Sequence, residues 1–579
     1  MQTARSAPGM QTWIPRSPFA LAVCVLTLVV LVLMFLPLGA IFLKALIPPD
    51  GRPALDLWIA TFTSSDLLIA ARNTLLIAVA TTALAVPVGV FFAWLVERTD
   101  ARWGALSRLL PVIPLLLPPV ALTIGWLFLA DPRAGFLANP VLAGFRAVNI
   151  DISASSLAIQ SWPGLIFLYV LFTVPHVYVV AAAAFSGLDP SLEEAARVFG
   201  KGRLRCFFGI SVPAIRYAVG SSALLCVISS LGLYSIPTLI GTAARIDVLS
   251  VYIYRLLNFA YPPKIGQAVV LGLAMIVVIG LIWLLQRRIA AKTGHAEIGG
   301  MGIRPNRIAL GKWRWPARLL LLLYVALTSV LPLLALFVVS LQPYWTPSLK
   351  LDSLSWGNYA DFAANDQSRA AIINSSLLAI ITTTIVVLVS GILAIYAKNM
   401  GGVREKWLGL LTKVPSAIPH IVFAVGVLIV FGFAPLNLSG TWLILFIAYL
   451  AVYLPQASIA AESAVQQVGN QLVEASRVFG AGPGRTFRTV QLPLILPGLA
   501  AGWALIFTLV VGELNAAAIL SGPRNPVIGY LILALFDNGT YSQLAALGSI
   551  IGVVSGITVS AALLFARPRF GQAVRFGAN

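Results

Sequence analysis

Long apolar runs, separated by short polar segments, fill most of this chain. Residues 19–43, 109–130 and 494–512 contain no charged side chain. A helix needs about 20 consecutive apolar residues to cross the hydrocarbon core of a bilayer, and runs of this kind recur along the whole sequence. The pattern therefore predicts an all-α integral membrane protein.

Twelve of these runs are expected to be transmembrane helices, six in each half. In the first half they lie near residues 18–45, 69–96, 106–130, 163–188, 214–241 and 265–286. In the second half they lie near residues 316–341, 370–398, 408–432, 440–462, 494–521 and 542–566. Proline removes a backbone hydrogen bond inside a helix. Either kinks near a gate or packing features are therefore expected at Pro114, Pro118, Pro415 and Pro419.

Composition supports a lipid environment. Hydrophobic residues make up 59% of the chain and charged residues only 10%, whereas a soluble domain carries about 25% charged residues. The net charge of +19 could indicate nucleic acid, but the basic residues form short clusters between apolar runs. Placing the N-terminus in the cytoplasm puts 28 of the 39 Lys and Arg residues on that side. This positive-inside bias predicts a multi-pass membrane protein with both termini cytoplasmic, and no nucleic-acid partner.

Two polar loops are near copies of each other. Residues 194–200 read EAARVFG and residues 474–480 read EASRVFG, and nine residues after each come ISVP and VQLP. The offset is 280 here, but upstream it is 301, where Asn73 pairs with Asn374 and Pro118 with Pro419. The first half therefore carries about 21 extra residues, within 131–162. Since each half has six spans, the halves form a parallel repeat.

The repeat divides the chain into two membrane domains. The first is expected at 1–286, with a cytoplasmic loop at 187–213, and the second at 319–579, with a loop at 467–493. Between them, residues 287–318 hold eight basic residues and one acid, Glu297, as expected for a cytoplasmic linker.

Each loop is predicted to contain a short amphipathic helix. In the first loop Asp189 or Ser191 can cap the helix and Pro190 fits its first turn, while Gly200 would end it with a positive φ. In the second loop Asn470 can cap and Gly480 would end the helix. Two apolar stripes at helical spacing are expected, from Leu192, Ala196 and Phe199, and from Leu472, Ser476 and Phe479. Such a stripe outside the bilayer either has a protein partner or packs on its own chain at the membrane surface.

The pattern E-A-A-x-x-x-G, nine residues, I-x-L-P resembles the signature of permeases of ATP-binding-cassette (ABC) importers. Two copies at a constant offset make the resemblance specific, and it covers most of the chain; Ser476 and Val490 depart slightly from the pattern. The chain is most similar to the fused two-domain permeases of ferric-iron uptake, with thiamine and 2-aminoethylphosphonate permeases as relatives. The resemblance implies the type I ABC importer permease fold and a place in the bacterial inner (plasma) membrane.

The resemblance also implies partners. In this family each loop helix binds a groove on an ATPase subunit, so two ATPase copies and a periplasmic substrate-binding protein are expected beside the lipid bilayer. No G-x-x-x-x-G-K-[ST] phosphate-binding loop occurs in the sequence. The chain is therefore expected to be no enzyme and to bind no cofactor, with ATP and Mg²⁺ on the partner ATPase. The residues expected to dock the ATPase are Glu194, Ala195, Ala196, Phe199, Gly200, Pro213, Glu474, Ala475, Ser476, Phe479, Gly480 and Pro493.

Few polar residues lie inside the apolar runs. Glu513 is an acid within the eleventh expected span, where ionisable groups are costly and face a cavity or a partner; its first-half counterpart is Leu233. Glu513, Asn515 and Tyr234 are candidate pore-lining residues, although Glu513 could equally make a structural salt bridge or hydrogen bond. The three cysteines show no metal-ligand spacing, so no metal site is expected.

The substrate is the least determined property. The resemblance favours ferric iron, and thiamine, 2-aminoethylphosphonate and polyamines remain alternatives in the same importer class. A secondary transporter with parallel repeats is the alternative from a different class, but it normally needs several intramembrane ionisable groups, and Glu513 is nearly alone. A non-transporting scaffold is the third hypothesis. Co-purification of an ATPase would separate the importer from both.

Overall fold

The computed structural model describes residues 18–47, 53–104, 106–137, 158–292, 307–400, 402–466 and 468–566, and isolated positions between 138 and 157. Within these residues the secondary structure is helical and contains no β-strand, which confirms the predicted all-α class. Most of the extra segment expected at 131–162 and the acidic position Glu297 of the linker lie outside the described residues.

The first half contains one long helix for most of the expected spans. Its helices are α1 (Pro18–Leu46), α2 (Ala54–Phe62), α3 (Ser65–Arg98), α4 (Leu106–Leu109), α5 (Pro119–Ala130), α7 (Trp162–Gly187), α8 (Ser191–Val198), α9 (Arg203–Cys206), α10 (Val212–Ala214), α11 (Arg216–Gly232), α12 (Leu249–Asn258) and α13 (Ile265–Ala291). Helix α13 continues to Ala291, past the domain end expected at residue 286.

The second half repeats this order. Its helices are α14 (Arg314–Val325), α15 (Leu331–Leu341), α16 (Gly357–Ala364), α17 (Asp366–Met400), α18 (Gly402–Leu411), α19 (His420–Val427), α20 (Trp442–Gln466), α21 (Asn470–Val478), α22 (Pro483–Thr486), α23 (Leu492–Val511), α24 (Ala517–Leu520), α25 (Ile528–Asp537) and α26 (Tyr541–Ala566). Helix α14 begins inside the segment expected to be linker.

Equivalent hydrogen bonds show that the repeat is structural. The Asn73 side chain donates to the carbonyl of Asp247 (2.9 Å), and Asn374 donates to that of Pro526 (3.0 Å). The next residue in each half, Thr74 or Ser375, accepts the first free N–H of α12 or α25. Matching π-helical turns stand at Phe207–Ser211 and Phe487–Gln491. Helices α3 and α17 therefore hold α12 and α25 in the same way.

The described residues contain nine helices that are long and apolar enough to cross a membrane, or eleven if two bent pairs each count as one span. The ninth expected span, 408–432, is shorter than predicted because its apolar helix begins only at His420. Its first-half equivalent bends by 86° between Leu116 and Pro119. Pro118 and Pro419 cause both breaks, since proline cannot donate to the helix ladder and keeps the preceding residue extended.

Two other expected spans are too long. The helix predicted at 214–241 ends at Gly232, and the one predicted at 494–521 ends at Val511. Short helical turns follow each break, at Pro237–Gly241 and at α24. The apolar pattern continues through both breaks, so hydrophobicity alone places the helix ends too late.

The first span of each half packs against both halves. Helix α1 packs against α13 of its own half and α19 of the second half, and α15 packs against α26 and against α5 of the first half. A methyl group added to Gly426 would lie 2.8 Å from the Pro37 carbonyl oxygen, and one added to Gly125 would lie 2.5 Å from the Pro332 Cβ. Glycine allows this close approach of two backbones. The halves therefore interlock.

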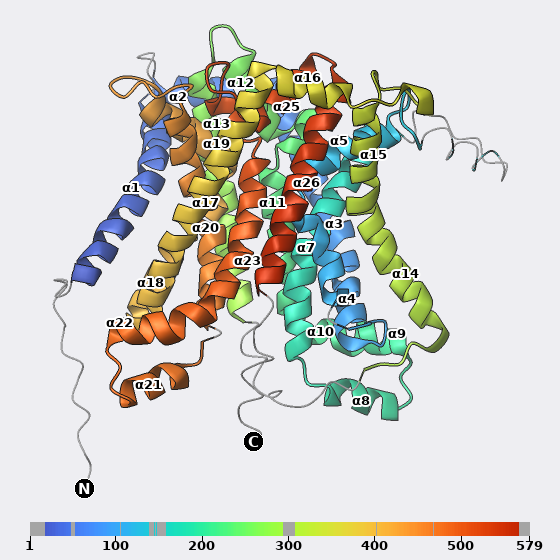
Figure 1. Cartoon of the computed structure of the whole chain (residues 1–579), viewed down its shortest axis with the longest axis vertical. Coiled ribbons are helices and arrows are strands. Elements are labelled where there is room, and N and C mark those ends of the chain that lie inside the picture. Colours follow the sequence, from blue (N-terminus) through green and yellow to red (C-terminus); the bar gives the residue numbers. More distant parts are fainter. Residues whose placement is uncertain are drawn as a thin grey trace.

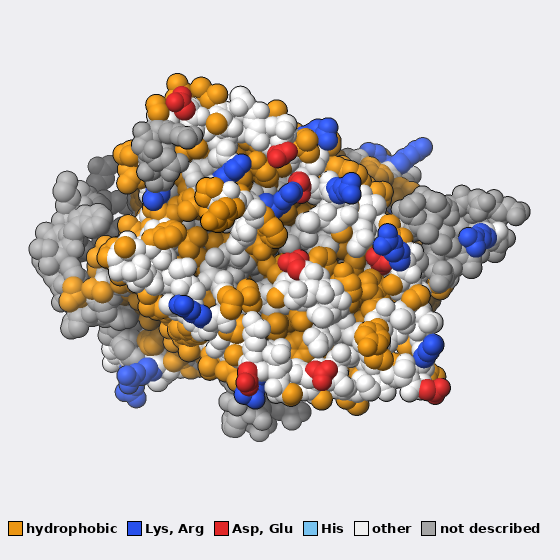
Figure 2. All heavy atoms as spheres, turned by 90° about the horizontal axis from the view of Figure 1, so that it is seen from above, with side chains coloured by type: hydrophobic (Ala, Val, Ile, Leu, Met, Phe, Trp, Pro, Cys, Tyr) orange, Lys and Arg blue, Asp and Glu red, His pale blue; other side chains and the backbone are white. Residues whose placement is uncertain are grey.

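The long helices form one bundle with distinct ends (Figure 1). Helices α8 and α21 stand outside the bundle at one end, and α2, α12, α16 and α25 cover the other. The face that carries α12 and α25 shows acidic and basic side chains scattered singly among apolar ones (Figure 2). The two loop helices thus lie on the same side, as the parallel repeat predicts.

Candidate docking helices and central residues

Helix α8 has a defined beginning and end. Asp189 caps it, because its side-chain oxygen accepts the Ser191 N–H at 2.9 Å. Hydrogen bonds from the Ser191 backbone and side chain hold the pKa of Asp189 below its ordinary value. At the other end the Lys201 N–H reaches back to the Ala196 carbonyl (3.0 Å) around Gly200, whose φ is +76°. This is a left-handed C-terminal cap of the Schellman type, and it confirms the predicted role of Gly200.

Helix α21 ends in the same way. The Ala481 N–H donates to the Ser476 carbonyl at 3.1 Å, and Gly480 has a φ of +78°. A Cβ at Gly200 or Gly480 would touch nothing within 4 Å, so the backbone conformation alone demands glycine at both positions. The Asn470 side chain, predicted to cap α21, lies outside the described residues.

The apolar side chains of the two helices differ from the predicted stripe. Ala196 is buried against the chain itself, whereas Leu192 is 48% exposed and Phe199 85% exposed. Val198, absent from the predicted stripe, is also exposed. The second helix repeats this arrangement with Leu472 (51%), Val478 (85%) and Phe479 (89%). The stripe prediction therefore fails at Ala196, which is buried. The most exposed apolar side chains lie at the C-terminal end of each helix, namely Val198 with Phe199 and Val478 with Phe479.

The remaining predicted docking residues differ in their exposure. Ala195, Glu474 and Ala475 are exposed, Glu194 is half-buried, and Pro213 and Pro493 are exposed in the first turns of α10 and α23. Ser476 is half-buried and its hydroxyl lies 3.1 Å from that of Thr486. The neighbouring acid Glu193, which the motif did not single out, is buried and pairs with Arg98 at the end of α3.

In the centre of the molecule, the glycine at each helix break contacts a proline of the opposite half. A Cβ at Gly512, after α23, would lie 2.5 Å from the Pro118 Cβ, and one at Gly232, after α11, would lie 3.7 Å from Pro419. Pro118 and Pro419 precede α5 and α19. The four broken helices therefore converge at the contact between the two halves.

Glu513 follows one of these breaks and is 5% exposed. Its carboxylate accepts hydrogen bonds from the Tyr453 hydroxyl and, at 3.0 Å, from the Ala516 N–H, and it lies 3.6 Å from His420 Nδ1. The carboxylate thus caps the start of α24 while it pairs with side chains of α19 and α20. His420 and Tyr453 escaped the sequence analysis, since His420 stands alone and Tyr453 lies among other aromatic residues.

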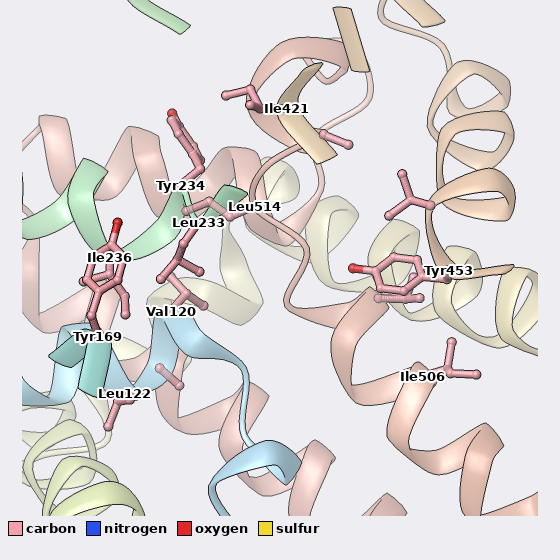
Figure 3. Close-up of a cluster of buried hydrophobic side chains, with 14 of the residues drawn as sticks. Val120, Leu122, Tyr169, Leu233, Tyr234, Ile236, Ile421, Tyr453, Ile506 and Leu514 are labelled. Atoms are coloured by element: carbon pink, nitrogen blue, oxygen red, sulfur yellow. The ribbon is translucent and has the colours of Figure 1, made fainter. Parts of the chain in front are cut away.

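The other two candidate pore-lining residues lie in different surroundings. Asn515 Nδ2 is 3.4 Å from His420 Nδ1, so Asn515 belongs to the Glu513 group. Tyr234 is fully buried, and its ring packs edge-on against Tyr254 at 5.5 Å. Figure 3 shows Tyr234 with Leu233 and Leu514 in a cluster of buried apolar side chains, and Tyr453 enters that cluster from another helix. Glu513 and Asn515 therefore lie together, whereas Tyr234 lies in apolar surroundings.

The part of the chain that the structure describes contains no group of three or more His, Cys, Asp or Glu residues that could hold a metal ion. The Glu513 group combines one acid, one histidine and one amide. It could contact a polar or cationic substrate, but as arranged its acid oxygens are occupied by protein donors.

Comparison with known proteins matches residues 85–295 and 387–575 to the family model described as binding-protein-dependent transport system inner membrane component. A ferric transport system permease protein of Actinobacillus pleuropneumoniae is 23% identical over 477 residues, covering 80% of this chain and 66% of the relative. An Fe(3+)-transport system permease protein of Haemophilus influenzae is 24% identical, covering 82% of this chain and 85% of the relative.

A shorter match is to a permease protein assigned to 2-aminoethylphosphonate transport in Salmonella typhimurium. It is 29% identical over 161 residues, which is 28% of this chain and 61% of the relative. The family model thus covers each half once, and each matched segment contains one docking helix.

Proposed function

Because the chain belongs to the family of binding-protein-dependent transport system inner membrane components, we propose that it is the pore-forming subunit of an ATP-driven importer. One observation carries this proposal: α8 and α21 both stand outside the bundle and expose the same apolar side chains at a constant offset. Exposed apolar surface of this kind marks a contact with another protein. Two copies of one ATPase subunit, one for each helix, fit the repeat.

The ATPase supplies the nucleotide chemistry in this proposal. ATP and Mg²⁺ bind to that partner, and this chain binds no cofactor and catalyses no reaction. Phe199 and Phe479 are the anchors that enter the ATPase, because large, exposed aromatic side chains dominate the binding energy of interfaces. Glu194 and Glu474, in the same helices, contribute polar contacts in this proposal.

The docking side faces the cytoplasm. Lys201, Arg203 and Arg205 follow α8, and Arg485 and Arg488 follow the end of α21, in agreement with the positive-inside bias. In this orientation the start of α1 at Pro18 and the end of α26 at Ala566 lie on the cytoplasmic side, which supports cytoplasmic termini. The opposite face, which carries α12, α16 and α25, receives a periplasmic substrate-binding protein.

Ferric iron is the proposed substrate, supported by the two long-matching relatives named for ferric transport. A hard cation prefers several oxygen ligands, and the Glu513 group offers few, so iron would pass chelated or partly hydrated. Thiamine, 2-aminoethylphosphonate and polyamines are the alternatives within the same class. Glu513 is the single acid at the central helix breaks. This does not favour a secondary transporter, because that class couples transport to ions through intramembrane ionisable groups.

Two measurements test the proposal. Purification of the tagged chain in mild detergent should recover an ATPase subunit in a 2:1 ratio, and the double variant Phe199→Ala with Phe479→Ala should lose it. Uptake of labelled ferric iron should fall in cells that lack the chain. Unchanged iron uptake with lost growth on 2-aminoethylphosphonate would replace the substrate, whereas retained ATPase binding by the double variant would overturn the docking assignment.

A further inference from the structure

A buried ion pair attaches the first docking helix to a membrane helix. Arg98, the last residue of α3, donates from Nε (2.9 Å) and Nη2 (2.6 Å) to the Glu193 carboxylate in α8. Both side chains are almost fully buried, with 2% and 3% of their surface exposed. The second carboxylate oxygen accepts the Ser211 hydroxyl at 2.7 Å. Glu193 is therefore fully satisfied, as a buried charge must be.

Arg98 also holds the chain on either side of α8. Its Nη1 donates to the Leu188 carbonyl at 3.1 Å, where α7 has just ended. Its own carbonyl accepts the N–H of Ile308, a buried linker residue that leads to α14. One residue thus joins α3, the docking helix and the connection to the second half.

The second half lacks this attachment. The residues equivalent to Arg98, Glu193 and Ser211 are Asn399, Val473 and Gln491, which cannot form a charged pair. Lys398 reproduces the contact with the loop backbone by donating to the Val468 carbonyl at 2.7 Å, but among the described side chains no ion pair joins α21 to α17. A small cavity lined by Lys398, Val468 and Gln491 occupies the corresponding place.

We propose that Arg98, through Glu193, is a positioning residue that fixes the first docking helix to α3, and that the second docking helix moves without such a fixed link. The ion pair makes α8 and α3 one rigid unit, because losing one partner would leave the other charge buried and unpaired. Closure of the partner ATPase would then reach α3 directly through the first loop and only through loop backbone in the second. The inference about transmission rests on the proposed function, whereas the inference about anchoring does not.

Hydrogen–deuterium exchange of the full chain in nanodiscs tests the anchoring without any partner. Glu193→Gln should accelerate exchange of amides 191–200 by about tenfold or more, while amides 470–480 stay unchanged. Glu405→Gln, an exposed acid in α18 on the second half, is the matched control and should alter neither segment. Unchanged exchange at 191–200, or equal acceleration in both loops, would overturn the proposal. Arg98→Lys keeps the charge and should give a smaller acceleration; acceleration as large as that of Glu193→Gln would count against a charge-mediated anchor.

A double-mutant cycle tests transmission in the complex reconstituted with its ATPase and binding protein. Glu193→Gln should lower the amount of substrate transported per ATP hydrolysed, and its effect should be non-additive with Phe199→Ala and additive with Phe479→Ala. Additive effects with both phenylalanine variants would contradict the inference that Glu193 acts through α8. If neither phenylalanine variant weakens ATPase binding, the docking function fails instead, and the exchange experiment still decides the anchor.

Discussion

Pro37 of α1 lies so close to Gly426 of α19 that a methyl group on the glycine would stand 2.8 Å from the proline carbonyl oxygen. Gly125 and Pro332 make the reciprocal contact between α5 and α15. These two pairs define how the halves interlock, since each first span is held partly by the opposite half.

Enlarging either glycine should loosen this interlock. Gly426→Ala and Gly125→Ala are expected to destabilise the protein by about 1–3 kcal/mol, because the added methyl group must displace backbone atoms. Thermal unfolding in detergent measures the effect. Gly39→Ala, in α1 with nothing within 4 Å, is the matched control and should leave the midpoint unchanged. Equal midpoints for all three variants would contradict the contact.

The glycines that end the docking helices should be irreplaceable for transport. Gly200→Val and Gly480→Val force a β-branched residue into positive φ, so the Schellman turn opens and the adjacent phenylalanine is misplaced. We expect lost transport with normal membrane insertion, measured by uptake and by the amount of protein in membrane fractions. Gly202→Val is the control, because Gly202 has a φ of −66° and open space. Normal transport by both variants would remove the coupling role.

Orientation can be tested with single introduced cysteines. Two exposed positions, one on each face of the molecule, suit this test. Gly202→Cys, beside α8, should be shielded from impermeant thiol reagents in intact cells, whereas Tyr261→Cys, whose parent side chain is fully exposed after α12, should react. The reverse labelling pattern would place the docking helices outside the cytoplasm.

The Glu513 carboxylate should stabilise the fold. Glu513→Leu introduces the residue that its first-half counterpart carries, but it leaves the Ala516 N–H without its acceptor. The Tyr453 hydroxyl loses one of its two acceptors and keeps the Leu509 carbonyl. We expect a loss of about 1–3 kcal/mol of stability, and a smaller loss for Glu513→Gln, which keeps an oxygen acceptor. Thermal unfolding measured together with uptake separates the readings: reduced uptake with unchanged stability would favour a pore-lining role.

The sequence predicted those features that depend on a local pattern or on the internal repeat. The offsets of 280 and 301 predicted equivalent positions, and the matching hydrogen bonds of Asn73 and Asn374 confirm them. The positive φ of Gly200 and Gly480 followed from their place at helix ends. These features depend on a few consecutive residues or on self-similarity, both of which a single sequence contains.

Tertiary contacts limited the prediction elsewhere. The breaks after Gly232 and Val511 lie within continuous apolar sequence, and the sequence does not show that Gly232 and Gly512 contact Pro419 and Pro118 of the opposite halves. Nothing in the sequence joins Arg98 to Glu193, which is 95 positions away, or brings His420 and Tyr453 to Glu513. The docking stripe was wrong because helical spacing gives a face but not the direction in which that face points.

Because α1 packs partly against the second half, it is synthesised long before one of its contact partners, α19. Pro37 and Gly426 are separated by 389 positions in the sequence, so at about 5–20 residues per second roughly 20–80 s pass between their emergence from the ribosome. During that time α1 resides in the bilayer without α19. Its composition suits this wait, because even in the finished fold only 17% of its most apolar window is buried by protein, and lipid can cover the remainder until the second half arrives.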